Sequence, residues 1–241
     1  MDWEFGDPLT PAHADRLVAR GADQTVVAAL AVREVLGPLP DWWHENDNAL
    51  YAVAGGVLPE RLIDRLVGYP CSDTLLVIAT DVPNLSSLLV SGAGATVLLG
   101  PESEFTAGDI YCGSASSVIF DGGVTATREA VVDARNGGSI VARRDQLWAA
   151  NVYVATDDMH RLESLETGVR LNPYGATITL GRHVWLGRDA ILTGHVDVGD
   201  DCVIGARSMV RGQKIPANTA VAGAPARVIR EGVTWTEEDG P

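Results

Sequence analysis

The sequence LGRHVWLGRDAILTGHVDVGDDCVIGARSMVRGQKI, residues 180–215, repeats a pattern every six positions. Glycine takes the second place of four hexads, and a small or β-branched residue takes the fifth place of five. A period of six differs from that of an α-helix or of a half-buried strand and is typical of a parallel β-helix. The aliphatic residues that open the six hexads are Leu180, Leu186, Leu192, Val198, Ile204 and Val210.

The repeat has a simple physical interpretation. Three hexads make one triangular coil, in which each hexad supplies a short strand and a corner. The aliphatic side chain points into the prism, and the fifth residue must be small because it also fits inside the tight corner. Glycine adopts the turn dihedrals that a side chain would resist, and successive coils pair at about the 4.8 Å spacing of strands. Residues 180–215 therefore predict two complete coils.

The same period continues, less regularly, from about residue 89 to residue 158. Short excursions at the corners interrupt it, for example at residues 136–139. We therefore expect a mainly β protein with a parallel β-helix of about five coils. The residues expected to point inward in this part are Leu99, Phe105 and Tyr111, then Phe120, Ala126 and Val132, then Ala142, Trp148 and Val154.

The first 88 residues lack the period and are predicted to form an α/β region. Thr10 followed by Pro11 is a helix start, with an N-cap and a proline in the first turn. We expect this region to cap the open end of the β-helix, because an uncovered coil exposes strand edges and core. The expected elements are helices over residues 13–21, 24–36 and 59–67, strands over 50–54 and 74–79, and a loop at 41–44.

The register breaks completely at residues 157–175, which are polar and charged. Insertions into solenoids form loops at a corner and often carry function. After residue 215, Pro216 ends the regular coil. The predicted organisation is thus a cap over residues 1–88, a β-helix over 89–215 with the loop at 157–175, and a partial coil and tail over 216–241.

Composition excludes several classes of partner. The formal net charge of −14 disfavours nucleic acid and anionic membranes, whose phosphates would repel the protein. The three cysteines, Cys71, Cys112 and Cys202, suggest no disulfide framework and a reducing compartment. The sequence has no signal-peptide pattern and no apolar run long enough to span a membrane. We therefore expect a cytoplasmic protein.

The candidate catalytic residue is His160, which lies in the loop. Histidine titrates near neutral pH and is the natural general base, although a lone surface histidine is common. Some hexapeptide-repeat proteins are zinc carbonic anhydrases, which need a pair of histidines five residues apart. Here His160, His183 and His195 are separated by 23 and 12 residues, so no catalytic metal is expected.

Several segments together resemble a known family. They are DDMH at residues 157–160, LETG at 165–168, NP at 172–173, HVWLG at 183–187, IGARS at 204–208, VAGAPARVI at 221–229 and GVTW at 232–235. In this order they resemble the hexapeptide-repeat acetyltransferases, the left-handed β-helix acyl-CoA enzymes. Among these, the sequence is most similar to the O-acetyltransferases of capsular and surface polysaccharides.

The resemblance implies an activity. The protein would move an acetyl group from acetyl-CoA to a hydroxyl of a sugar or polysaccharide, with His160 as general base. An amino sugar, an antibiotic or another small natural product is the alternative acceptor. A non-catalytic β-helix scaffold and a metal-dependent hydratase remain as competing interpretations. The first predicts that His160→Ala leaves function intact, and the second predicts bound metal.

The resemblance also implies site residues and an assembly. Trp185 matches the tryptophan beside the catalytic histidine and the pantetheine, and the family works as homotrimers with shared sites. Gly205, Ala206, Gly223 and Ala224 match the edge along which the pantetheine runs, where small residues allow close approach. Candidates for the CoA phosphates are Arg211, Lys214, Arg227 and Arg230, and candidates on the substrate side are Asp157, Asp158, Glu166 and Asn172.

Overall fold

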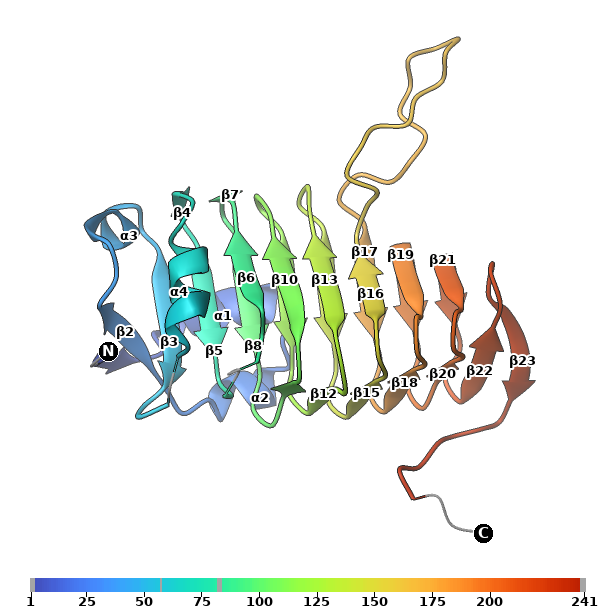
Figure 1. The fold of residues 1–241 in the computed structure, drawn as a ribbon, viewed down its shortest axis with the longest axis horizontal. Coiled ribbons are helices and arrows are strands. Elements are labelled where there is room, and N and C mark those ends of the chain that lie inside the picture. Colours follow the sequence, from blue (N-terminus) through green and yellow to red (C-terminus); the bar gives the residue numbers. More distant parts are fainter. Residues whose placement is uncertain (1–2, 57, 82–83, 239–241) are drawn as a thin grey trace.

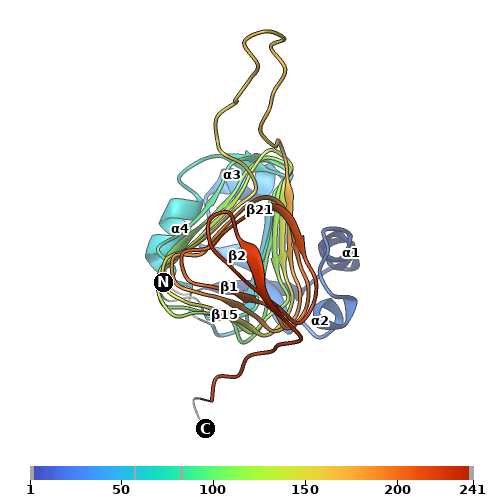
Figure 2. The ribbon, with the colours of Figure 1, turned by 90° about the vertical axis from the view of Figure 1, so that its right-hand side faces the viewer.

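Successive hexads form successive faces of a triangular prism. Leu180, Leu186 and Leu192 are fully buried, and each lies on a strand that pairs in parallel with the strand one turn earlier. The three strands are β17 (Thr177–Leu180), β18 (Val184–Leu186) and β19 (Ile191–Val198). In the computed structural model the repeat continues as a left-handed parallel β-helix of about seven turns (Figures 1 and 2).

The prism has three faces, which we number in chain order. The first face contains β5 (Leu75–Ile78), β8 (Thr96–Leu99), β11 (Ser117–Phe120), β14 (Ser139–Ala142), β17 and the ends of β19 and β21 (Met209–Ile215). The second contains β9 (Glu104–Phe105), β12 (Val124–Ala126), β15 (Gln146–Trp148), β18, β20 (Val203–Ile204) and β22 (Thr219–Ala222). The third contains β6 (Ser87–Val90), β10 (Gly108–Cys112), β13 (Ala130–Ala134), β16 (Val152–Ala155) and the starts of β19 and β21.

The structure describes residues 3–56, 58–81 and 84–238, so the outermost residues of the expected cap and tail lie outside it. Within it, the side chains expected to point inward are buried, with one exception. Tyr111 faces outward beneath the Arg135 guanidinium, 4.1 Å from its ring centre, and Ile110 and Cys112 are buried instead. The interval from Phe105 to Ile110 is one residue shorter than a hexad, which shifts the register.

The β-helix begins earlier than residue 89. β5 already pairs in parallel with β8, which adds turns to the five that the sequence predicts. This part of the first face is apolar on both sides, because α1 (Pro11–Ala19) and α2 (Gln24–Ala28) pack on its outer surface. The outward side chains under these helices are Val77, Leu98, Ile119 and Val141. The period is hidden here because outward positions are as apolar as inward ones.

The rest of the N-terminal region covers the end of the prism. Trp43, Leu62 and Leu66 are buried in the same cluster as the interior of the coils. The helix predicted over residues 24–36 is wrong in its second half. The chain after α2 forms a strand that pairs with its neighbours instead. The elements are β1 (Glu4–Pro8), β2 (Val32–Gly37), α3 (Asp41–Glu45) in place of the expected loop, β3 (Ala49–Val53), α4 (Glu60–Leu66), and the pair β4 (Cys71–Ser72) and β7 (Gly92–Ala93).

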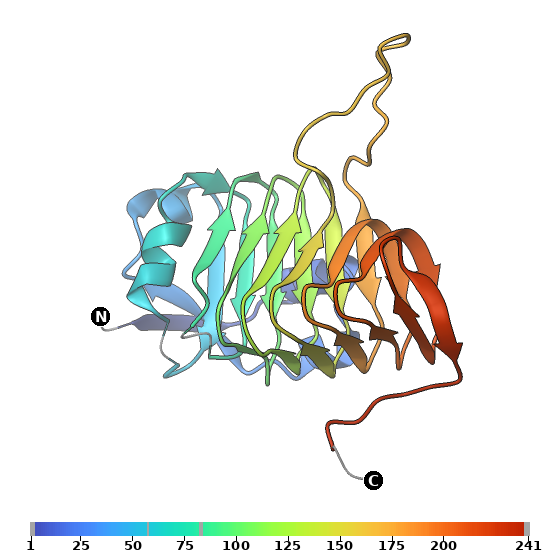
Figure 3. The same cartoon turned by 45° about the vertical axis from the view of Figure 1, so that its right-hand side comes forward.

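A long loop leaves the prism between β16 and β17 and stands away from its body (Figure 3). Its regular structure within the described chain is one isolated bridge, between Glu163 and Arg170. At the opposite end from the cap, β23 (Arg227–Glu231) turns back antiparallel to β22 and ends the solenoid. Of the helices that the structure describes, none is long and apolar enough to cross a membrane.

Candidate functional site

Two acidic side chains fix the start of the loop. Asp157 is buried and accepts hydrogen bonds from the Asn136 side chain and, at 3.0 Å, from the Met159 N–H. Asp158 forms an ion pair of 2.8 Å with Arg211 on the third face. Both carboxylates are predicted on the substrate side; in this structure Asp157 is buried and supports the loop, and Asp158 is engaged with Arg211.

Asn172 fixes the segment around His160. Its side-chain amide donates to the His160 carbonyl at 2.7 Å and accepts from the Leu162 N–H at 2.9 Å. Asn172 is only 7% exposed and holds the loop from within through these two bonds. Its expected contact with substrate stays a prediction. The His160 side chain remains exposed. The backbone of the candidate base is therefore anchored while its ring is free to meet a ligand.

The returning arm of the loop lies on the corner between the third and first faces. A Cβ at Gly194 would lie 3.5 Å from Pro173 Cγ and 3.9 Å from Arg211 Cγ. Gly194 also has a φ of +72°, which favours glycine. Because Pro173 directly follows Asn172, this contact places the root of the loop, and His160 with it, at this corner.

The loop exposes several large apolar side chains along its length. Leu165 is fully exposed, and Glu166, expected on the substrate side, lies beside it with no ion pair among the described contacts. Isolated exposed apolar residues are common, but a group on one projecting segment indicates a surface that another molecule covers. The exposed members are Met159, Leu162, Leu165, Val169, Leu171 and Tyr174.

Trp185 lies on a different face from the root of the loop. It projects from β18 on the second face, is 38% exposed, and its ring centre lies 6.3 Å from that of Trp235. Trp235, in the tail, in turn stacks on His183. The described contacts include none between His160 and Trp185, so one chain does not bring these two predicted site residues together.

The small residues predicted to border the donor do lie together. Gly205-Ala206 and Gly223-Ala224 occupy the corner between the second and third faces in consecutive turns, after β20 and after β22. The turns approach closely here: a Cβ at Gly187 would lie 2.6 Å from the Ala206 nitrogen. The resulting edge consists largely of backbone and is accessible from outside.

The predicted phosphate-binding cations are not all on this edge. Arg211 lies on the third face with Asp158, and Lys214 on the first face, 2.8 Å from Asp197. Hydrogen bonding to Asp197 and its charge raise the pKa of Lys214. Arg227 does follow the edge, at the start of β23, and two arginines that were not predicted, Arg188 and Arg207, lie on the edge itself, where Arg207 pairs with Asp189 at 3.4 Å. Arg188 directly follows Gly187, and Arg207 lies two residues after Gly205. These positions in their hexads place both arginines at the same corner and could have identified them from the sequence.

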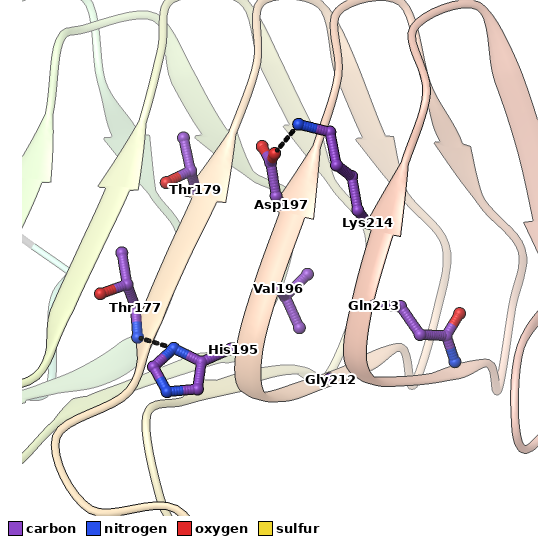
Figure 4. Close-up of a pocket in the computed structure, with 8 residues that line it drawn as sticks. All are labelled: Thr177, Thr179, His195, Val196, Asp197, Gly212, Gln213 and Lys214. Atoms are coloured by element: carbon purple, nitrogen blue, oxygen red, sulfur yellow. Dashed lines mark hydrogen bonds and ion pairs between the residues drawn. The ribbon is translucent and has the colours of Figure 1, made fainter.

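A shallow hollow of about 440 Å³ lies on the first face beside the root of the loop (Figure 4). Thr177, Thr179, His195 and Gln213 line it with the Asp197–Lys214 pair. His195 Nδ1 accepts a hydrogen bond from the Thr177 N–H at 3.2 Å. Within the ranges that the structure describes, no three histidine, cysteine or carboxylate side chains are grouped to hold a metal ion.

Comparisons with known proteins agree with this architecture. Residues 177–212 match the family model described as bacterial transferase hexapeptide (six repeats). Over 170 residues, the chain is 25% identical to WbbJ of Escherichia coli (strain K12), named as an O-acetyl transferase of lipopolysaccharide biosynthesis, covering 69% of this chain and 79% of that one. Over 58 residues it is 47% identical to the galactoside O-acetyltransferase of the same strain, covering 24% of this chain and only 28% of that protein.

One solved structure is also similar over most of the chain. The polySia-specific acetyltransferase NeuO superposes with a TM-score of 0.60 at 25% sequence identity, over 71% of this chain and 78% of that one. The repeat, the three-faced prism and these relatives agree on one conclusion. The chain is similar in repeat and in fold to the hexapeptide-repeat acetyltransferases.

Proposed function

We propose that the protein transfers an acetyl group from acetyl-CoA to a hydroxyl of a sugar or polysaccharide. Its relatives are named as O-acetyltransferases of galactosides and of lipopolysaccharide biosynthesis, and NeuO as specific for polySia. One observation carries the proposal: the repeat breaks to expose the ring of His160 while Asn172 holds its backbone. A site of this kind orients a base toward an incoming ligand.

In the proposed reaction His160 removes the proton from the acceptor hydroxyl as its oxygen attacks the thioester carbonyl. The carbon–oxygen bond forms, the carbonyl electrons move to an oxyanion, and collapse of this intermediate breaks the carbon–sulfur bond. The imidazolium then returns its proton to the departing CoA thiolate. Asp157 and Asp158 are engaged elsewhere, so neither holds the second ring nitrogen of His160 in this arrangement.

The donor in this proposal lies along the edge formed by residues 205–206 and 223–224. Small residues let the pantetheine amides reach backbone groups there. Arg188, Arg207 and Arg227 are near enough along the chain to this edge to meet the phosphates, and the Asp189 carboxylate that pairs with Arg207 lies on the same edge, whereas Arg211 and Lys214 lie on other faces. The hollow beside His195, lined by hydroxyl and amide groups, suits a sugar acceptor.

The site is completed by a second copy in a homotrimer. His160 and Trp185 lie on different faces of one prism, and the loop that carries His160 exposes apolar side chains such as Leu165. In a cyclic trimer the loop of one copy covers the second face or the donor edge of the next, which removes these side chains from water. Acetyl-CoA is made inside cells, and the proposed location is therefore cytoplasmic.

The direct test is an assay of acetyl transfer from acetyl-CoA to a panel of galactosides, oligosaccharides and amino sugars. Release of the CoA thiol measures the rate of transfer. His160→Ala should abolish transfer and leave CoA binding unchanged, because His160 acts on the acceptor proton. His44→Ala, at an exposed histidine in the cap, is the matched control. Transfer by His160→Ala at the wild-type rate would refute the assignment, and faster transfer to amines than to hydroxyls would refute the acceptor class.

A further inference from the structure

The tail after β23 crosses the outside of the prism. We name residues 232–235 the strap; it runs along the corner between the first and second faces. Val233 N–H donates to the Asn218 carbonyl at 3.0 Å, and Thr234 Oγ1 donates to Asp201 Oδ1 at 3.0 Å. Trp235 Nε1 then donates to the His183 carbonyl at 2.9 Å. Consecutive residues of the strap therefore contact consecutive turns of the solenoid, in the direction of the N-terminal end.

The corner under the strap has a uniform geometry. Asp145, His183, Asp201 and Asn218 lie at this corner in four consecutive turns, and all have a left-handed backbone with φ between 56° and 66°. Asp, Asn and His are the residues other than glycine that tolerate this conformation best. Their side chains therefore form a row on which the strap lies, with His183 as its aromatic member.

The contacts of His183 determine its protonation state. Nδ1 lies 2.6 Å from Asp145 Oδ2, and Nε2 lies 2.9 Å from the Trp235 carbonyl oxygen. A carboxylate and a carbonyl can only accept hydrogen bonds, so both ring nitrogens must donate. Neutral imidazole carries a single N–H and would lose one of the two bonds. Both bonds therefore form together only in the imidazolium.

Ring contacts and nearby charges agree with this assignment. The rings of His183 and Trp235 are parallel within 3° and 4.1 Å apart, a cation–π arrangement when His183 is charged. Partial burial lowers the pKa of His183, but the hydrogen bonds to Trp235 and Asp145 and the charges of Asp145 and Asp201 raise it more, for a net increase. Asp145 and Asp201 are the charged groups that face the ring, from the turns on either side.

We infer that Trp235 is a second aromatic residue of the donor site, and that charged His183 positions it beside Trp185 to hold the pantetheine arm of the acyl donor. Trp235 is 8% exposed and rigidly held, whereas Trp185 is more open, so a chain of methylenes and amides can pack against the pair. The inference rests on the proposed function, because that function places the donor beside Trp185.

The inference has a definite pH dependence. A histidine whose pKa is raised by folding contributes its stabilisation fully below its ordinary pKa of about 6.5 and loses it as the pH rises through the raised value. The strap is therefore firmly held in mildly acidic solution and loosens above that value. Donor affinity should decrease over the same range, since Trp235 is then no longer fixed beside Trp185.

The experiment is calorimetric titration of the full-length protein with CoA from about pH 5.5 to about pH 8.5. Trp235→Leu should weaken CoA binding about tenfold in acidic solution. His183→Asn keeps a residue that tolerates the left-handed backbone and should remove the part of the pH dependence that is due to His183. Asp145→Asn, at an exposed position, should move that part to lower pH. The control is His44→Asn, which should bind CoA as the wild type does.

Imidazole NMR titration of His183, assigned by comparison with His183→Asn, gives an independent measurement. A pKa of His183 above the ordinary value of about 6.5, lowered again in Asp145→Asn, supports the imidazolium. A pKa of His183 at or below about 6.5 overturns its role. Wild-type CoA affinity in Trp235→Leu overturns the inference while leaving the proposed function intact. Failure of the wild type itself to bind CoA refutes the proposed function, and the inference with it.

Discussion

The clean repeat at residues 180–215 and the loop at residues 157–175 are stabilised in different ways. In the repeat, each turn buries aliphatic residues such as Leu192 and pairs with its neighbours along its strands. In the loop, a few polar groups at the root, chiefly Asp157 and Asn172, hold a segment whose Leu165 is fully exposed. The repeat therefore provides a rigid surface, and His160, the proposed base, lies where the repeat is interrupted.

The largest effect should come from the interior of the repeat. Leu192→Ala leaves a cavity in a close-packed prism and should lower the free energy of unfolding by about 2–5 kcal/mol. Leu165→Ala, the matched change in the loop, should alter the free energy of unfolding of the dissociated chain by less than about 0.5 kcal/mol, because within one chain the side chain is in water. Chemical denaturation of both variants provides the comparison. Equal losses would contradict the difference drawn between the two regions.

A smaller effect, on catalysis rather than stability, should come from the root of the loop. Asn172→Ala removes the bonds to the backbone on both sides of His160 and should lower kcat by about tenfold to a hundredfold, since small displacements of a base are costly. The KM for acetyl-CoA and the melting temperature should change little. Glu166→Ala, at the outer part of the loop, is the control. Loss of stability without loss of kcat would assign Asn172 a purely structural role.

The smallest effect should come from single cations along the donor edge. Arg188→Ala and Arg207→Ala should each weaken CoA binding by up to about fivefold, and less at high salt, as expected for exposed charge pairs. Lys214→Ala should leave it unchanged, because Lys214 pairs with Asp197 on another face. Calorimetry at two salt concentrations measures all three. Weaker binding only in Lys214→Ala would place the donor on the first face.

Much of the fold follows from the sequence because the interior of a β-helix repeats. Phe120, Ala126 and Val132 are all buried, as their spacing predicts. The prediction was less accurate where a second layer covers the prism. The strand at residues 75–78 is apolar on both sides, which hides the period, and residues 32–37 pair as a strand despite a helix-like sequence. Local patterns cannot report contacts made with distant segments.

The candidate site shows the same limit more strongly. The interruption of the period identified the loop, and the family resemblance identified His160 in it. Nothing in the local sequence indicates that His183 contacts Trp235, 52 residues away, or that Asp158 binds Arg211, 53 residues away. The sequence therefore predicted that Arg211 binds a CoA phosphate, whereas in the structure Arg211 pairs with Asp158 on the third face. Contacts between distant turns depend on the solenoid's geometry, which determines which corners align.

The central claim is that His160 of one copy acts on a donor held beside Trp185 of the next. Subunit complementation tests it most directly. His160→Ala and Trp185→Ala should each be nearly inactive in acetyl transfer, and trimers reassembled from a mixture of the two should regain activity, because some sites then combine an intact His160 with an intact Trp185. Mixed trimers without activity, or an active monodisperse monomer, would contradict the claim.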